Sequence, residues 1–341
     1  MIRELDRLVA RVRKVAPLEV ANEVPDSPLV SVIVPTYNHR KVIAQALESV
    51  LAQRTDFGFE ILVGEDASTD GTREICRDIA SRNAGRIRLI LQRPENRIVI
   101  DGVQTGRFNL LDLLSRCRGE FVAWLDGDDY WMDETKLSAQ VETLHTRPDA
   151  VMCMTNAVRE IDGRRTTEYF VPRRLFRDVS RRELAAGEPI INQSVLFRNV
   201  LSDPSFPESI LDVVNADTVF WAWLGRFGMA IARPDLQPVV YRVHRGGVWS
   251  LRSGIQRARF RRRTFEVVAE MSSDPWVRGR LADRRTGQAL KGIAAALRAG
   301  EARASLEFCR AFLSEVAARP AALLYVFRQV AERVLFGRRG A

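Results

Sequence analysis

The sequence lacks several features that mark whole classes of protein. Its 341 residues include only four cysteines, Cys76, Cys117, Cys153 and Cys309, and no two of them are close enough in sequence for a zinc site or a disulfide framework. No apolar run approaches the roughly 18–20 residues that are needed to span a bilayer. The first residues, Met-Ile-Arg-Glu-Leu-Asp-Arg, carry acids and lack the apolar core of a signal peptide. We therefore expect reduced thiols in a cytoplasmic protein that does not cross the membrane by itself.

Two glycine motifs of nucleotide-binding proteins are also missing. There is no G-x-G-x-x-G after the first apolar run and no G-x-x-x-x-G-K-[ST] anywhere in the chain. These absences exclude a dinucleotide-binding fold and a P-loop enzyme. Without a glycine loop that surrounds phosphates, any bound diphosphate would need a metal ion to balance its charge.

The composition, 46% hydrophobic and 28% charged, is that of a soluble globular protein, but the net charge of +9 is unevenly distributed. From residue 251 to the end there are 19 basic and 8 acidic residues, a balance of +11, so the preceding residues sum to −2. A nearly neutral body followed by a basic region indicates an anionic partner for that region alone.

Apolar runs alternate with helical periodicity in the first half of the chain. The runs predict buried strands, and the segments between them predict helices. The strands are expected at 29–35, 59–64, 86–91 and 120–125, and the helices at about 2–15, 40–53, 71–82 and 106–117. This alternation predicts an α/β fold with a doubly wound, mostly parallel sheet and flanking helices. After residue 250 the pattern is helical, at about 255–271, 275–299, 301–318 and 321–337, which predicts a C-terminal helical extension.

Acidic side chains follow two of the predicted strands, where ligands of such sheets bind. Leu125-Asp-Gly-Asp-Asp places three carboxylates within four residues, and like charges so close together are costly unless a cation or hydrogen-bond donors compensate them. Carboxylate oxygens are ligands for Mg²⁺ or Mn²⁺, so a metal site at Asp126 and Asp128 is predicted. An EF-hand is excluded because Trp131 stands where its loop needs glycine. Glu65 and Asp66 precede a helix and could accept hydrogen bonds from a base or a ribose.

Three segments together resemble the family 2 glycosyltransferases, which have the GT-A fold. They are Val30-Ser-Val-Ile-Val-Pro-Thr-Tyr-Asn, Glu65-Asp-Ala-Ser-Thr-Asp-Gly-Thr and Leu125-Asp-Gly-Asp-Asp, in the order and spacing of that family. The resemblance covers about residues 29–250. It implies that Tyr37 stacks on the nucleotide base, that Asp66 hydrogen-bonds the base, and that Asp128 binds the metal directly. Further nucleotide contacts implied in this way are Pro35, Glu65 and Asp126, although the family more often has Asp in place of Glu65.

Two later segments resemble the second half of the same family. Asn215-Ala-Asp-Thr resembles its E-D-x-x-L segment and implies that Asp217 is the catalytic base, although Ala216 replaces the usual Glu. Asp217 could also cap a helix, and Asp212 is a rival for the same role. Tyr241-Arg-Val-His resembles the Y-R-x-H segment, so His244 is a candidate metal or diphosphate ligand and Arg242 a candidate diphosphate contact. By position alone, Gln193 and Trp131 are candidate acceptor contacts, and His39 is expected to be a turn residue.

These observations divide the chain into four parts. Residues 1–28 hold an amphipathic helix and a linker, 29–130 the nucleotide-sugar-binding half, 131–250 the acceptor-binding half with the catalytic base, and 251–341 the basic helical region. The helix expected at 321–337 is basic and amphipathic, and two interpretations stay open. It could lie on an anionic membrane surface, or it could pack on the protein or on a second subunit. The oligomeric state is open as well.

The function expected from the resemblance is an inverting, divalent-metal-dependent glycosyltransferase. It would move a sugar from a nucleotide diphosphate donor, with UDP the expected carrier, to a glycan or lipid-linked acceptor in cell-surface polysaccharide synthesis. The enzyme would work on the inner face of a bacterial membrane. A sugar nucleotidyltransferase is an alternative, but it should begin with a Gly-rich, Arg-containing loop where this chain has Pro-Thr-Tyr-Asn-His. A non-enzymatic binder of nucleic acid or of a membrane surface leaves the strand-end acids unexplained, so we expect no nucleic-acid partner.

Overall fold

The computed structural model describes residues 3–244, 249 and 251–324 of the chain. Among these residues, eight strands form the main sheet in the order β1-β4-β3-β2-β7-β11-β8-β12. Their bounds are β1 (Leu18–Glu19), β2 (Val30–Thr36), β3 (Phe59–Glu65), β4 (Ile87–Leu91), β7 (Phe121–Trp124), β8 (Ala150–Met154), β11 (Val195–Arg198) and β12 (Met229–Ala232). Strands β4, β3, β2 and β7 are parallel, whereas β11 is antiparallel to both of its neighbours. The expected mostly parallel α/β sheet is confirmed.

Helices cover both faces of this sheet. Successive residues of a strand point to opposite faces, so Val32 and Ile33 of β2 enter two different cores. The Ile33 side is covered by α1 (Glu4–Val12), α4 (Arg107–Arg116) and α7 (Ala216–Leu224). The Val32 side is covered by α2 (Ile43–Leu51), α3 (Thr72–Arg82) and α5 (Lys136–Thr146). Burial on both faces explains why these strands are apolar along most of their length.

Two smaller sheets lie beside the main one. Strands β10 (Arg164–Tyr169), β9 (Ala157–Ile161) and β13 (Val239–Val243) form a sheet in that order, and β5 (Ile98–Ile100) pairs with β6 (Val103–Thr105). The short helices are α6 (Arg181–Ala185) and the 3₁₀ turns Pro94–Asn96, Arg173–Leu175, Asn192–Ser194 and Glu208–Leu211. An isolated bridge between Tyr130 and Val240 joins β13 to the segment that follows β7. This bridge matters for the site because β13 leads directly to His244.

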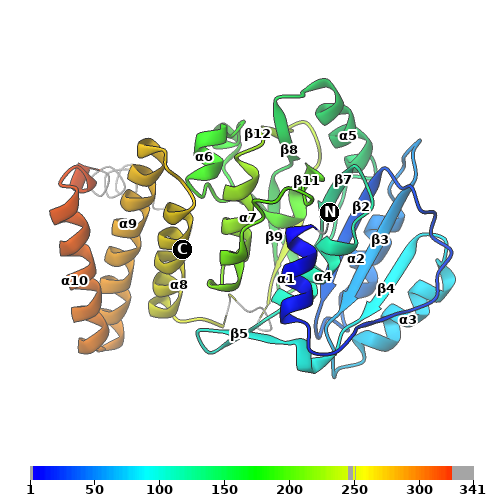
Figure 1. The fold of residues 1–341 in the computed structure, drawn as a ribbon, viewed down its shortest axis with the longest axis horizontal. Helices are drawn as coiled ribbons and strands as arrows, with labels where there is room; N and C mark the ends of the chain where they lie inside the picture. The colour runs from blue at the N-terminus through cyan, green and yellow to red at the C-terminus, as the bar shows by residue number, and fades with distance from the viewer. Residues whose placement is uncertain (1–2, 245–248, 250, 325–341) are drawn as a thin grey trace.

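The C-terminal region is helical, as expected. Helices α8 (Gly254–Glu270), α9 (Pro275–Ala299) and α10 (Ala302–Ala318) stand side by side at one end of the molecule, with α9 between the other two (Figure 1). The helix expected at 321–337 lies outside the described residues from position 325 onward. Within the described ranges, no helix is both long enough and apolar enough to span a membrane.

Candidate active site

A cavity of about 1160 Å³ lies beyond the carboxyl ends of β2 and β7. Its wall on the sheet side contains Thr36, Tyr37 and His39 after β2, and Asp126, Asp128 and Asp129 after β7. The opposite wall is formed by the start of α7 and by residues of α8 and α9. Because ligands of parallel α/β sheets bind at this end of the strands, the cavity is the candidate active site.

The two acids of the D-x-D segment have different surroundings within the cavity. Trp124 Nε1 donates a hydrogen bond of 2.8 Å to Asp126 Oδ1. The burial of the Asp126 carboxyl group and the nearby charge of Asp128 raise the pKa of Asp126. Burial alone would also raise the pKa of Asp128, but the hydrogen bond from His244 and the charges of His39 and His244 hold it below its ordinary value. Asp128 is therefore the acid that stays ionised and is available to a cation.

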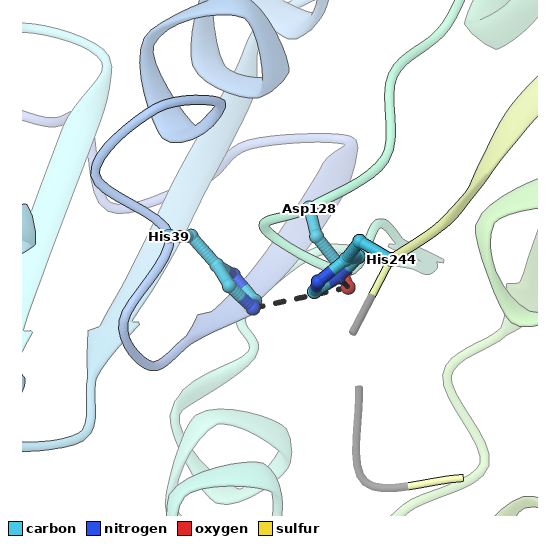
Figure 2. Close-up of side chains that lie close together, drawn as sticks. All are labelled: His39, Asp128 and His244. Carbon is cyan, nitrogen blue, oxygen red and sulfur yellow. Dashed lines mark hydrogen bonds and ion pairs between the residues drawn. The ribbon is translucent and has the colours of Figure 1, made fainter. Parts of the chain in front are cut away.

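Two histidines converge on the carboxylate of Asp128 (Figure 2). His244 Nε2 lies 2.8 Å and His39 Nε2 lies 3.8 Å from Asp128 Oδ2. One ligand atom from each of these three residues lies within 4.8 Å of the others, which is close enough for all three to hold one ion. The hydroxyl of Thr36 lies 3.1 Å from His39 Nδ1 and so orients the other ring nitrogen toward Asp128. His39 belongs to the turn after β2, as expected, but its ring also joins this group.

The D-x-D loop leaves no space for a side chain at its middle position. A Cβ atom added to Gly127 would lie 2.7 Å from both Cβ and Oγ1 of Thr36, and 3.1 Å from Cδ1 of Ile43. Gly127 also donates its backbone N–H to Pro35 O at 3.0 Å. The close approach of the loop to β2 therefore requires glycine here, and it brings Asp128 next to His39.

Arg242 holds the same loop from the other side. Its side chain is 9% exposed, its Nη1 donates to Asp128 O at 2.8 Å, and its Nε donates to Glu160 Oε1 at 2.8 Å. Its Nη2 contacts Gln45 Oε1, and its guanidinium lies 4.5 Å from the centre of the Tyr130 ring. The backbone N–H of Arg242 also donates to Asp129 Oδ1 at 2.7 Å. Since these bonds engage all three guanidinium nitrogens, Arg242 acts here as a support of the loop, and its contact with a diphosphate stays a prediction.

Three of the residues expected after β2 and β3 to contact the nucleotide lie at the cavity. Pro35, Tyr37 and Asp66 line the cavity. Burial raises the pKa of Asp66 to about 7, against the opposing charge of Arg97. Arg97 lies 4.8 Å from the centre of the Tyr37 ring and donates to the carbonyl oxygens of Asp66 and Ala67 at 2.9 Å, so that it joins both segments.

Two residues that were expected to contact a ligand do not line the cavity. Glu65 is fully buried and does not line the cavity. Its carboxylate accepts a hydrogen bond of 2.7 Å from Ser68 N and pairs with Arg73, so it fixes the loop that presents Asp66. Trp131 is 4% exposed and packs in the core, where its Nε1 donates to Gln193 O at 2.8 Å. Trp131 therefore positions Gln193, which does line the cavity and whose Nε2 is buried without a protein partner.

The acid at the start of α7 faces the same cavity. Asp217 lines it, whereas the rival Asp212 is exposed and does not. Burial raises the pKa of Asp217, although the N–H of Thr218 donates to its Oδ1 at 2.8 Å and the charges of Arg107 and Arg261 oppose the shift. A carboxylate with a raised pKa is suited to accept a proton at neutral pH.

A family model supports the resemblance found in the sequence. The model described as glycosyl transferase family 2 matches residues 31–197, which include the two strand-end motifs and the D-x-D segment. The chain belongs to glycosyl transferase family 2. A protein of Mycobacterium tuberculosis (strain ATCC 25618 / H37Rv) with no assigned function is 35% identical over 221 residues, which are 64% of this chain and 60% of that protein. The chain thus spans less than two thirds of the length of that relative.

Two further comparisons concern a related enzyme and a solved structure. The UDP-Glc:α-D-GlcNAc-diphosphoundecaprenol β-1,3-glucosyltransferase WfaP of Escherichia coli is 28% identical over 220 residues, which are 64% of this chain and 79% of that protein. The mannosyltransferase PcManGT of Pyrobaculum calidifontis, solved with GDP-Man and Mn²⁺, has a TM-score of 0.53 at 20% identity, covering 98% of this chain and 95% of that one. This likeness confirms the GT-A fold of the family 2 chain.

The family motifs did not reveal three residues that shape this family 2 site. His39 joins Asp128 and His244, Arg97 covers Tyr37, and Arg107 supports the segment before Asp217. The buried guanidinium of Arg107 donates to Val213 O at 3.0 Å and to Val214 O at 3.1 Å. The position of His39 next to the Tyr-Asn turn was the one sequence signal available, because the partners of Arg97 and Arg107 are far away along the chain.

Proposed function

We propose that this family 2 chain is an inverting glycosyltransferase that uses a nucleotide diphosphate sugar and a divalent metal ion. The proposal is carried by one observation: the same cavity contains Asp217 and the group of His39, Asp128 and His244. The first can hold an ion beside a diphosphate, and the second can accept a proton. Asp66 and Tyr37 line the same cavity on the sheet side, where the base and ribose would bind.

The residues near Asp128 fit a divalent ion. They offer one carboxylate oxygen and two imidazole nitrogens, and the phosphate oxygens of the donor would add further ligands. Carboxylate and phosphate oxygens suit both Mg²⁺ and Mn²⁺. We therefore propose Mn²⁺ or Mg²⁺ as the ion. The bound ion would supply positive charge to the departing diphosphate.

The proposed reaction is a single displacement at the anomeric carbon of the donor sugar. Asp217 accepts the proton of the acceptor hydroxyl, whose oxygen forms the new bond to the anomeric carbon. The bond from that carbon to the phosphate oxygen breaks, and its electron pair leaves with the nucleoside diphosphate. Attack on the face opposite the leaving group inverts the configuration. General base assistance of this kind is typically worth about 10²–10⁴ in rate.

The acceptor proposed is a glycan or a lipid-linked sugar in cell-surface polysaccharide synthesis. It is supported by the similarity to WfaP, whose name gives a diphosphoundecaprenol-linked sugar as the acceptor. UDP is proposed as the nucleotide on the same similarity. Peripheral membrane contact through the C-terminal helix rests on residues beyond 324 and stays a prediction from the sequence.

The test is release of nucleoside diphosphate from a panel of UDP-, GDP- and dTDP-sugars, with and without Mn²⁺. We expect slow release from one donor, loss of that release with EDTA, and loss in Asp128→Ala. Asp212→Ala is the matched control, since Asp212 is exposed and outside the cavity. If no sugar nucleotide is turned over and none raises the melting temperature of the wild type, the proposed function is wrong.

A further inference from the structure

The half of the cavity that is formed by the C-terminal helices differs in charge from the half formed by the sheet. Of the described residues from 249 onward, those that line the cavity include Arg252, Arg261, Arg284, Lys291 and Arg298, and they include no acid. The sheet side supplies the acids Asp66, Asp126, Asp128 and Asp129, and the start of α7 supplies Asp217. The excess positive charge of the C-terminal region is therefore directed in part into the active-site cavity.

Three of these cations form a row on one helix. Arg284, Lys291 and Arg298 of α9 are spaced seven residues apart, and seven residues complete almost two turns, so all three lie on one side of the helix. The row is about 21 Å long, since each helical residue rises about 1.5 Å. Gly287 and Ala294 lie between the three cations and also line the cavity. The small side chains leave this side of α9 open to a ligand between the charges.

The three cations of the row differ in burial and in their contacts. The guanidinium of Arg284 is 5.7 Å from the centre of the Phe265 ring, and its Nη2 contacts Glu188. The Nε atom of Arg284 is buried and has no hydrogen-bond partner among the residues that the structure describes. Lys291 and Arg298 are exposed. Arg261 of α8 connects this wall with Asp217, whose pKa its charge lowers.

Apolar side chains accompany the cations. Leu290 lines the cavity beside Lys291, and Leu251, which is 62% exposed, lines it from the segment before α8. A cavity wall with a row of cations and adjacent apolar side chains fits a ligand that carries both phosphate and hydrocarbon. Arginine in particular matches phosphate oxygens with two donors at once.

We propose that the acceptor carries a phosphate or diphosphate group, which binds to the row Arg284, Lys291 and Arg298 while the acceptor hydroxyl lies at Asp217. This inference rests on the proposed function and specifies the acceptor of the same site. The nucleotide's own diphosphate would lie on the sheet side with Asp128, so the cavity has two separate anion-binding regions. The shared chemistry is a sugar phosphate, and its source is either a prenyl-linked sugar or a soluble phosphorylated sugar.

The test measures binding to the full-length protein after saturation with Mn²⁺ and the nucleoside diphosphate that the donor panel identifies. The probes are farnesyl diphosphate, inorganic pyrophosphate and uncharged farnesol, titrated by calorimetry. The double variant Lys291→Gln/Arg298→Gln removes two cations of the row. The matched control Arg303→Gln/Arg310→Gln removes two exposed arginines with the same seven-residue spacing on α10, outside the cavity.

We expect the diphosphate probe to bind wild type and the control with affinities within about twofold, and to bind the row variant about 10- to 100-fold more weakly. Binding of farnesyl diphosphate alone indicates a lipid-linked source, and equal binding of pyrophosphate indicates a soluble one. The proposal is overturned if neither charged probe binds, if farnesol binds as tightly as its diphosphate, or if both variants weaken binding equally. It is also overturned if the probes displace the nucleotide. Donor turnover by wild type is measured separately. If the donor is turned over but the row variant binds the probes as wild type does, this inference fails while the proposed function stands.

Discussion

The middle residue of the D-x-D segment offers a sharp test of the site geometry. In Gly127→Ala the new Cβ would lie 2.7 Å from Thr36 Cβ and Oγ1, whereas ordinary contacts between such atoms are about 3.5–4.0 Å. Either the loop or Thr36 must therefore move by about 1 Å. Thr36 orients His39, and the loop carries Asp128, so either movement separates two of the three candidate metal ligands.

The expected effect is large on activity and moderate on stability. A displacement of about 1 Å in a positioned reacting group can cost about 10² in rate. Overpacking of a well-packed site costs about 1–3 kcal/mol of unfolding free energy. We therefore expect Gly127→Ala to fold, to lose about 100-fold in kcat, and to need more Mn²⁺ for half-maximal rate.

The assay is the initial rate of nucleoside diphosphate release as a function of Mn²⁺ concentration, together with a thermal melt. Gly58→Ala is the control, because a Cβ at Gly58 would meet nothing within 4 Å and the residue lies outside the cavity. Wild-type rate and unchanged Mn²⁺ dependence in Gly127→Ala would refute the claim that this contact positions the metal ligands. Equal losses in both variants would show that the effect is not specific to the site.

Three further predictions follow from single contacts. Asp217→Asn should lower kcat about 10²–10⁴-fold with little change in donor KM. Because burial raises the pKa of Asp217, the wild-type rate should fall with decreasing pH around a pKa above that of an ordinary carboxylate. A fall around the ordinary carboxylate pKa would contradict the assignment of Asp217 as the base. In Mn²⁺ titrations of the rate, His244→Ala should raise the Mn²⁺ concentration needed for half-maximal rate more than His39→Ala does. The reason is that His244 lies 2.8 Å and His39 3.8 Å from Asp128 Oδ2. If neither variant changes this concentration, both histidines are excluded as metal ligands. Burial lowers the pKa of Lys136 to about 7, so between about pH 7 and 10 the unfolded chain binds more protons than the folded chain. The unfolding free energy of wild type minus that of Lys136→Met, measured by urea melts, should therefore rise across this window by up to about 1.4 kcal/mol per pH unit. A difference that does not change with pH would refute this prediction.

Four strands of the main sheet, β2, β3, β4 and β7, were predictable because each is a short apolar run bounded by polar or small residues. Expected and observed strands agree closely, for example 29–35 against Val30–Thr36 and 59–64 against Phe59–Glu65. Such runs are typical of strands that are buried on both faces, and the spacing left room for helices between them. The reversed strand β11 was not predictable, since direction depends on how distant segments pair.

The sequence located the strand-end acids but could not tell which of them face the cavity. Glu65 and Asp66 are adjacent, yet the first turns into the protein to meet Arg73 and the second lines the cavity. Neighbouring residues at the end of a strand point in different directions. A difference of one position in the sequence therefore separates a structural role from a binding role. Trp131 shows the same limit, because its ring enters the core only three residues after Asp128.

The C-terminal charge could be counted from the sequence but not placed. The helices were expected within a few residues of their observed bounds, and their positive charge was attributed to an anionic partner of the region as a whole. The packing of α8 and α9 against the rest of the chain directs Arg261, Lys291 and Arg298 into the active-site cavity. A seven-residue spacing marks one side of a helix, but only the tertiary structure shows what that side faces.

The Tyr-Arg-x-His segment supports the candidate metal site in two ways. Arg242 and His244 are two residues apart at the end of β13, and alternate residues of an extended strand point to the same side. Arg242 fixes the D-x-D loop through Asp128 O and Asp129 Oδ1, so the same short segment that holds the loop also presents His244 to Asp128. The loop cannot shift relative to β13 without breaking the bonds that Arg242 makes to Asp128 O and Asp129 Oδ1. Arg242 therefore holds Asp128 close to His244 whether or not it touches a phosphate.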